Sequence, residues 1–130
     1  MVKPIPHNTM TIFTAGHGNQ SFNEFRSLLT KHGVTLLVDV RSKPYSRWVP
    51  HFNKNYLEAH LPMQYAWIRE LGGLEVIAPD VFDEAIEKLI RFSKRYEVCV
   101  MCSEKDHLKC HRYTKIQPAL EERRVKIIHI

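Results

Sequence analysis

Residues 101–112 hold the densest group of reactive side chains in the sequence, MCSEKDHLKCHR. The segment contains two thiols, two carboxylates, two imidazoles and three cationic side chains. It follows an apolar run and precedes a helical pattern, and α/β proteins place ligand-binding and catalytic residues in such loops, at the carboxyl ends of strands. The sequence therefore predicts a functional site here before it indicates a reaction.

Two cysteines in this segment are candidate nucleophiles, Cys102 first and Cys110 second. A thiol at a strand end, near cations or a helix amino terminus, can have a lowered pKa and exist partly as thiolate. Phosphatases and sulfurtransferases place an arginine six residues after the cysteine, whereas this sequence has Leu108 there. Phosphocysteine chemistry is therefore disfavoured, and the alternative that both thiols only pack a tight loop stays open.

Zinc is the metal that these residue types would suit. Cys99 and Cys102 are spaced like half of a structural zinc site, and His107 and His111 could add imidazole nitrogens. Residues three apart on a strand point to opposite faces, however, so Cys99 and Cys102 are poorly placed to share an ion. We expect no metal and no cofactor, with a zinc-stabilised or redox-responsive domain as a remaining alternative.

Polar residues also follow two other predicted strands, and the carboxyl ends of parallel strands lie on one edge of a sheet. His17 follows the first strand between two glycines, which let backbone and ligand approach closely. His17 is a candidate general acid or base, and Glu104 is a second candidate for proton transfer. We expect the three strand ends to converge on one crevice.

Anion binding is predicted at the end of the second strand and the start of the last helix. Asp39 and Arg41 share a strand face and would both reach the crevice, unless Asp39 is tied to backbone or a helix terminus. Arg41 and Arg112 would clamp phosphate or carboxylate, the alternative being ion pairs with Glu104 or Asp106. The predicted substrate-binding residues are Asp39, Arg41, Ser42, Tyr45, Trp48, Cys110, His111 and Arg112.

Residues 41–56 interleave cations with aromatic rings, a combination that follows phosphate backbones and stacks on bases. Prolines and polar residues interrupt the segment, so we expect an exposed functional loop without regular structure between residues 42 and 55. Alternatively, its rings fold back on the domain as a lid while its cations stay solvated.

The elements that must position these residues alternate between strand-like and helix-like patterns. This alternation predicts a single three-layer α/β domain over residues 1–130, with a mostly parallel sheet of about five strands flanked by helices. A Rossmann-like topology is expected without a dinucleotide fingerprint, because the glycine pattern at residues 16–18 is incomplete. Strands are predicted at residues 9–15, 34–40, 63–68, 97–101 and 125–130, and helices at 21–33, 55–60, 80–96 and 111–124, after a tail at 1–8.

Two of the helices carry predicted signals at their ends. Ser21 with Glu24 matches a capping box, and Asp80 is expected to cap the third helix. Pro118 should kink the last helix or mark a late start.

The charge and hydrophobicity of the chain indicate which kinds of partner and which compartment to expect. The net charge of +5 and a pI near 9.2 favour a nucleotide, a nucleic acid or another anionic ligand. Apolar runs are far shorter than a membrane span, and the amino-terminal residues lack a signal-peptide core, so a cytoplasmic protein without membrane attachment is expected. Three cysteines without an export signal favour reduced thiols.

The ordered motifs of the chain resemble the domain of unknown function 488 family. These are TAGH at 14–17, DVRSKPYS at 39–46, FN at 52–53, LGG at 71–73, MCSEKD at 101–106, CHR at 110–112 and IIHI at 127–130. The resemblance implies a compact α/β domain with a site built from these motifs, and it brings no established reaction. Gly18 departs from the family pattern, in which serine is more often expected.

Together, the residues predict a small enzyme that acts on a phosphate-bearing substrate such as a nucleotide or nucleic acid. Its site would comprise His17, Arg41, Cys102, Glu104 and Arg112. The alternative is a non-catalytic module that binds nucleic acid or protein through residues 41–56.

Overall fold

Five strands form one parallel sheet in the computed structural model, which describes residues 10–104, 108, 110 and 112–130, with backbone alone at residues 112 and 113. Their spatial order is β3-β2-β4-β1-β5, and each neighbouring pair is parallel. The predicted α/β fold class is thus confirmed. The strands are β1 Thr11–Gly16, β2 Leu36–Asp39, β3 Gln64–Trp67, β4 Val98–Cys102 and β5 Lys126–His129.

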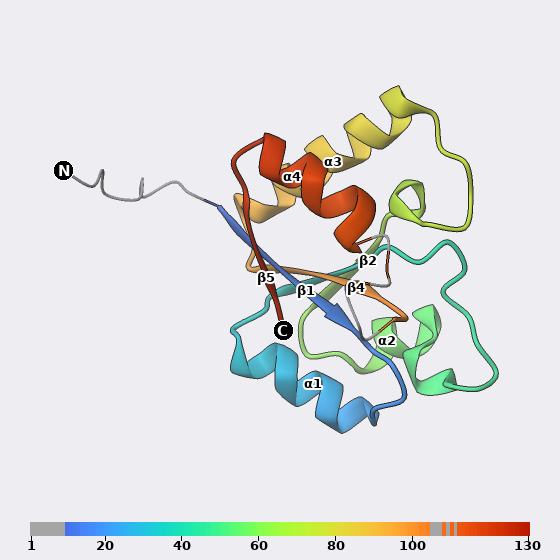
Figure 1. The fold of residues 1–130 in the computed structure, drawn as a ribbon. Coiled ribbons are helices and arrows are strands. Elements are labelled where there is room, and N and C mark those ends of the chain that lie inside the picture. The colour runs from blue at the N-terminus through green and yellow to red at the C-terminus, as the bar shows by residue number, and fades with distance from the viewer. Residues whose placement is uncertain (1–9, 105–107, 109, 111) are drawn as a thin grey trace.

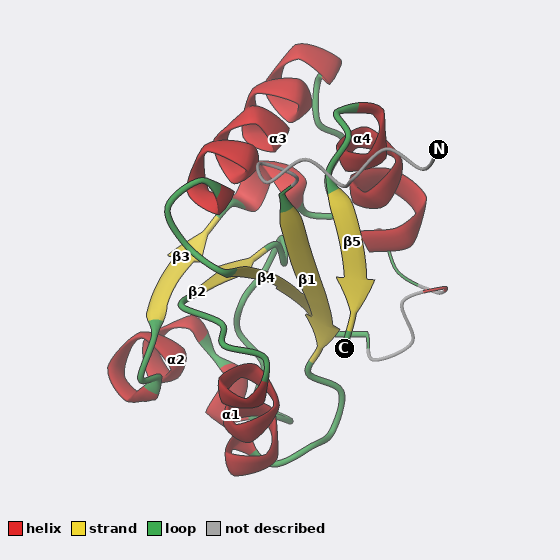
Figure 2. Ribbon diagram, turned by 90° about the vertical axis from the view of Figure 1, so that its left-hand side faces the viewer, coloured by secondary structure: helices red, strands yellow, loops and turns green. Residues whose placement is uncertain are grey.

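Helices cover both faces of this sheet and complete the three layers (Figure 1). Figure 2 shows α1 and α2 on one side and α3 and α4 on the other. The described helices are α1 Phe22–Lys31, α2 Lys54–His60, α3 Pro79–Ser93 and α4 Gln117–Glu122. None of the helices in the described part of the chain is both long enough and apolar enough to cross a membrane.

The central strands β2 and β4 are buried along their whole length because helices cover both of their faces. Alternate residues face opposite layers: Leu37 and Cys99 pack in the core beside α1 and α2. Val38 and Cys102 pack in the core beside α3 and α4. The prediction that Cys99 and Cys102 face opposite sides is therefore confirmed.

Helix α1 begins as the sequence predicts. Ser21 Oγ accepts a hydrogen bond from the Glu24 amide at 3.1 Å, and Glu24 Oε1 accepts one from the Ser21 amide at 3.4 Å. Phe25 and Leu29 form the buried face of the helix. Gly33 follows with a φ of 71°, a left-handed conformation that favours glycine after a helix.

One helix start differs from the prediction and another agrees with it. Helix α3 has Ala78 at its N-cap and Pro79 in its first turn, so the prediction that Asp80 is the cap is wrong. Proline suits this position because it has no amide hydrogen to leave unpaired. The last helix begins as a π-helical turn at Arg112–Ile116, and Pro118 lies in the first turn of α4, as a late start requires.

The segment between residues 42 and 55 is less exposed and more regular than predicted. Pro50–Phe52 form a 3₁₀ turn, and α2 begins at Lys54. Phe52 is fully buried between layers, where its ring contacts Phe25 at a centroid distance of 5.3 Å. Phe52 therefore folds back on the domain, as the alternative for the rings of this segment expects, because it finds apolar partners that are distant in sequence, whereas Trp48 stays exposed.

The connections after neighbouring strands leave the sheet toward opposite layers. The chain continues from β1 and β2 into the layer of α1 and α2, whereas from β4, which lies between them, it continues into α4. Such a divergence opens a crevice outside the carboxyl ends of the strands, the usual ligand position in open α/β sheets.

Candidate functional site

The three predicted strand ends meet at the carboxyl edge of the sheet. The amide of His17 donates to the carbonyl of Cys102 at 3.0 Å, and the amide of Gly18 donates to the carbonyl of Ser103 at 3.0 Å. On the other side, the amide of Val40 donates to the carbonyl of Met101 at 3.0 Å. The loops after β1 and β2 are therefore fastened to the end of β4.

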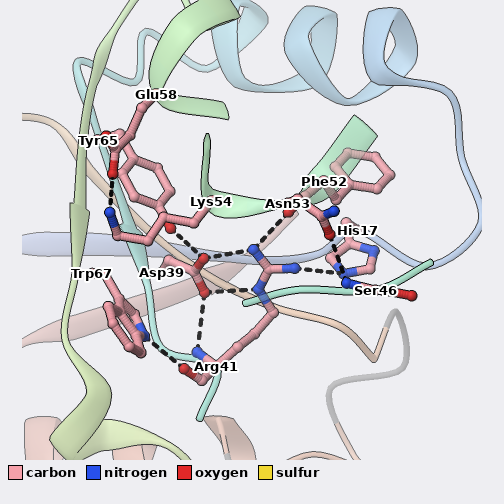
Figure 3. A network of polar contacts seen from close by, with 10 residues as sticks. All are labelled: His17, Asp39, Arg41, Ser46, Phe52, Asn53, Lys54, Glu58, Tyr65 and Trp67. Carbon is pink, nitrogen blue, oxygen red and sulfur yellow. Dashed lines mark hydrogen bonds and ion pairs between the residues drawn. The ribbon is translucent and has the colours of Figure 1, made fainter. Parts of the chain in front are cut away.

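A buried ion pair occupies the end of β2 (Figure 3). Asp39 Oδ1 accepts hydrogen bonds from the Arg41 backbone amide at 3.0 Å and from Arg41 Nε at 2.9 Å. Asp39 Oδ2 accepts one from Arg41 Nη2 at 2.6 Å, and the same Nη2 donates to the carbonyl of Phe52 at 2.7 Å. The predicted alternative partners of Arg41 were Glu104 and Asp106, of which Asp106 lies outside the described residues; in the structure Arg41 pairs with Asp39, so much of its charge is compensated within the chain.

His17 contacts Arg41 from the layer of α1 and α2. Its ring stacks on Phe52 at a centroid distance of 4.4 Å, and its Nδ1 donates to the carbonyl of Gly18 at 2.8 Å. Arg41 Nη1 approaches His17 Nε2 at 3.5 Å. Burial lowers the pKa of His17 from 6.5 to about 4; the Gly18 carbonyl opposes this decrease and Arg41 adds to it. His17 is therefore neutral at pH 7, with its Nε2 turned to the guanidinium.

Two aromatic side chains of the edge strand β3 complete this network. Tyr65 Oη donates to Asp39 Oδ2 at 2.5 Å, and Trp67 Nε1 donates to the carbonyl of Arg41 at 2.7 Å. Burial, and then the Asp39 carboxylate, raise the pKa of Tyr65 well above its ordinary value. From the sequence, Tyr65 and Trp67 were expected to line the mouth of the site beside residues 71–73; they bind the ion-pair network instead and are absent from the described lining of the cavity.

A cavity of about 290 Å³ lies on the other side of Arg41, where the ends of β2 and β4 meet. Its lining comes from the loop after β2, from residues that follow β3, and from the end of β4 with the segment beyond it. Among the described residues the lining consists of Arg41, Ser42, Lys43, Gly73, Leu74, Cys102, Ser103, Glu104 and Cys110.

Two thiols lie side by side in the wall of this cavity. Cys102 Sγ and Cys110 Sγ are 2.8 Å apart, and Cys102 Sγ also donates to the carbonyl of Glu104 at 3.4 Å. Both residues are buried, with exposed fractions of 2% and 7%. Cys99 lies in the opposite core, where its Sγ contacts the carbonyl of Val100.

The wall formed by Ser42 depends on Gly72, which belongs to the LGG motif at residues 71–73. Ser42 Oγ accepts a hydrogen bond from the Leu74 amide at 3.0 Å. A Cβ atom on Gly72 would lie 2.2 Å from Ser42 Oγ and 2.9 Å from Ser42 Cα. Gly72 is thus the residue that lets the loop after β3 approach the loop after β2.

The predicted site residues separate into distinct groups. Cys102, Glu104, Ser42 and Cys110 line the cavity, and Arg41 belongs to both the cavity and the ion-pair network. His17 and Asp39 lie in the network and are absent from the described cavity lining.

The remaining predicted binding residues lie elsewhere. Tyr45 and Trp48 are exposed to 55% and 81%, away from the described lining of the cavity, and the Arg47 guanidinium lies 5.2 Å from the Trp48 ring centroid. His111 lies outside the described residues, and Arg112 is described only as backbone of the π-helical turn. Of the predicted clamp of Arg41 and Arg112, the structure therefore describes the side chain of Arg41 alone.

The structure bears on metal binding only in part. In the described ranges, His, Cys, Asp and Glu side chains form no group of three or more that could hold an ion. The zinc alternative also drew on His107 and His111, which lie outside those ranges.

Comparison with known proteins identifies the family. A family model described as "Domain of unknown function DUF488" matches residues 21–81 and 74–114, which together span 21–114 of the 130 residues. No curated protein and no solved structure matches the chain. The matched region contains the buried ion pair and the whole described lining of the cavity. On this match, the chain belongs to the DUF488 family.

Proposed function

We propose that the chain is a small enzyme whose reaction takes place on an anionic, phosphate-bearing substrate in the cavity between the ends of β2 and β4. The observation that carries this proposal is the position of two thiols and a carboxylate, those of Cys102, Cys110 and Glu104, in one cavity at the point where the strand connections diverge. Reactive groups gathered at such a point are typical of an enzyme site.

The size of the cavity limits the substrate. A volume of about 290 Å³ suits a small phosphate ester or part of a mononucleotide. A nucleic-acid duplex is far wider than this cavity. A nucleic acid could therefore place only one terminal or extruded nucleotide in it. A mononucleotide or smaller ester is therefore the substrate class that we favour.

The residues take different roles in this proposal. Cys102 is the nucleophile toward a carbon centre of the phosphate-bearing substrate, because Leu108 six residues later disfavours attack at phosphorus. Glu104 transfers protons at the exposed side of the cavity. Lys43 attracts the anion, because its side chain is exposed at the cavity while the Arg41 charge is largely compensated by Asp39. His17 acts as a positioning residue, since its neutral ring supports Arg41 from behind.

The test combines a substrate panel with matched variants. Nucleoside monophosphates, sugar phosphates and inorganic phosphate are screened for binding by calorimetry, and the esters are screened for turnover. Cys102→Ser is expected to abolish turnover and keep binding, and Lys43→Ala to weaken binding about tenfold, as loss of one charged contact does. Lys94→Ala is the control, because Lys94 is exposed at the C-cap of α3, before β4 begins. Turnover that survives in Cys102→Ser would remove the nucleophile assignment, and failure of every phosphate-bearing compound to bind would remove the substrate class.

A second function is favoured by the exposed rings of the segment 41–56. Phe52 folds into the core, whereas Trp48 stays exposed with Arg47 against its ring. A cation stacked on an exposed indole is the kind of platform on which single-stranded bases stack. In this alternative the segment binds single-stranded nucleic acid without catalysis.

Salt titration separates the two functions. Binding of a fluorescent oligonucleotide should weaken steeply with salt, and Trp48→Ala should weaken it roughly tenfold, the lower part of the range for loss of one stacked base. Cys102→Ser should bind the oligonucleotide like the unmodified chain. Equal binding by Trp48→Ala would contradict the alternative.

A further inference from the structure

The sulfur atoms of Cys102 and Cys110 lie close together in the cavity wall. This closeness points to a reaction between the two thiols themselves, which does not involve the substrate of the proposed enzyme. Cys102 Sγ and Cys110 Sγ are 2.8 Å apart, and a disulfide bond is about 2.05 Å long. The two atoms therefore need to approach by less than about 1 Å to bond. Such an approach is within the range of ordinary side-chain rotations about χ1.

We propose that Cys102 and Cys110 are a redox modification site, at which a small hydroperoxide converts the two thiols into a reversible disulfide. The site is distinct from the third cysteine, because Cys99 lies in the core on the other face of the sheet. The proposal does not rest on the proposed function, since it concerns the thiols alone.

The cavity favours a small oxidant. Both sulfur-bearing residues are nearly buried, and solvent reaches them through a cavity of about 290 Å³. Hydrogen peroxide is comparable in size to water and enters such a space, whereas a bulky oxidant such as oxidised glutathione does not fit beside Ser42 and Glu104. Access to the pair is therefore selective by size.

The reaction balances without a cofactor. One thiolate attacks a peroxide oxygen, the O–O bond breaks, and a sulfenic acid and one molecule of water result. The second thiol attacks the sulfenic sulfur, the S–O bond breaks, an S–S bond forms and a second molecule of water leaves. Two electrons pass from the two sulfur atoms to the peroxide, and the two thiol protons end in water.

The disulfide would alter the site that it lines. Cys102 belongs to the rigid central strand β4, and Cys110 precedes the π-helical turn at Arg112–Ile116. A bond between them consumes both cavity thiols and ties the segment beyond β4 to the sheet. The oxidised protein consequently carries no thiol in the cavity that could act as a nucleophile.

Thiol counting tests the proposal on the full chain. The reduced protein is treated with hydrogen peroxide, denatured, and titrated with a thiol reagent. Three reactive thiols before treatment are expected to fall to one, with an intact mass lower by two hydrogen atoms, and dithiothreitol should restore all three. Peptide mapping should find residues 102 and 110 in the same cross-linked pair.

Matched variants make the result decisive. Cys99→Ala should still lose two thiols, whereas Cys110→Ser should form no intramolecular disulfide and should leave a sulfenic acid at Cys102 that dimedone traps. Oxidised glutathione should react with the unmodified chain at least about tenfold more slowly than peroxide, because the cavity excludes it. Three thiols after peroxide, a disulfide that involves Cys99, or sulfinic acid that dithiothreitol does not reverse would each overturn the proposal.

Discussion

The Asp39 carboxylate and the Arg41 guanidinium form a buried ion pair between residues only two positions apart, at the end of a central strand. Their side chains are exposed to 0% and 5%, and Tyr65 donates a further hydrogen bond to the same carboxylate. A charge that is removed from water in this way is costly unless its partner remains. The pair therefore fixes the loop after β2, and with it one wall of the cavity.

Replacing Asp39 by Asn should lower the free energy of unfolding by about 3–5 kcal/mol, because Arg41 would remain buried without a counter-ion. Chemical unfolding at pH 7 measures the effect. Glu75→Gln is the control, since Glu75 pairs with Arg69 at the surface, and its loss should cost less than about 1 kcal/mol. Equal, small effects of both changes would show that the buried pair is not a stabilising unit.

The neutral state of His17 predicts a pH dependence of stability. Burial lowers the pKa of His17 from 6.5 to about 4. Below pH 6.5 His17 therefore binds a proton in the unfolded chain but stays neutral in the folded chain until the pH approaches 4. The contribution of His17 is complete above its unfolded pKa and is lost as the pH falls toward its folded pKa. It should decrease by about 2 kcal/mol from pH 7.5 to pH 5.

Unfolding of the unmodified chain and of His17→Gln at several pH values isolates this contribution. The difference in stability between them should shrink as the pH falls, because glutamine does not titrate. A difference that stays constant over this range would mean that the pKa of His17 is the same in the folded and unfolded chains.

The hydrogen bond from Tyr65 to Asp39 should be worth about 1.5–3 kcal/mol, because its acceptor is ionised and largely buried. A double-mutant cycle with Tyr65→Phe and Asp39→Asn measures the coupling. Spectrophotometric titration should also show one tyrosine that ionises at higher pH than the others in the unmodified chain and is missing from Tyr65→Phe. Tyr45→Phe is the control, since Tyr45 is exposed; identical titration curves for the two variants would contradict the assignment.

Gly72→Ala should disturb the cavity as well as the stability. The added Cβ would lie 2.9 Å from both the backbone nitrogen and Cα of Ser42, so the two loops must move apart. We expect a loss of about 1–3 kcal/mol, and Ser42→Ala should not relieve it, since the backbone contacts remain. Gly33→Ala is the comparison, because its Cβ would meet no atom within 4 Å and only the left-handed backbone carries strain. Binding of the nucleoside monophosphates and sugar phosphates should weaken in Gly72→Ala and stay unchanged in Gly33→Ala.

Local patterns were sufficient to predict most of the fold. Continuous apolar runs predicted the buried strands β2 and β4, and the Ser21 capping box predicted the start of α1, because both signals depend on neighbouring residues. The sequence left open whether the rings of residues 41–56 are exposed or fold back on the domain; Phe52 is buried by contacts with His17 and Phe25, whereas Trp48 is exposed. Contacts between residues so distant in sequence leave no periodic signal.

The candidate site was predictable to a similar degree. Parallel strand order implied that His17, Arg41 and Cys102 end on one edge, and the hydrogen bonds between their loops agree with this. The sequence could not decide how Arg41 is used: an anion clamp and an ion pair with Glu104 or Asp106 were the alternatives considered, whereas the structure pairs Arg41 with Asp39. It also could not separate His17 from the cavity, since that depends on which layer each loop enters.

The position of β4 also constrains how the chain folds during synthesis. β1 and β2 are consecutive strands, yet they are not neighbours in the sheet, because β4 lies between them and begins only at Val98. While the ribosome has made fewer residues than this, the edges of β1 and β2 that face β4 have no partner. Pairing between segments so far apart in sequence is slow, and unpaired strand edges favour aggregation. The sheet therefore closes only after β4 has been synthesised, when this central strand enters between two strands that are already made.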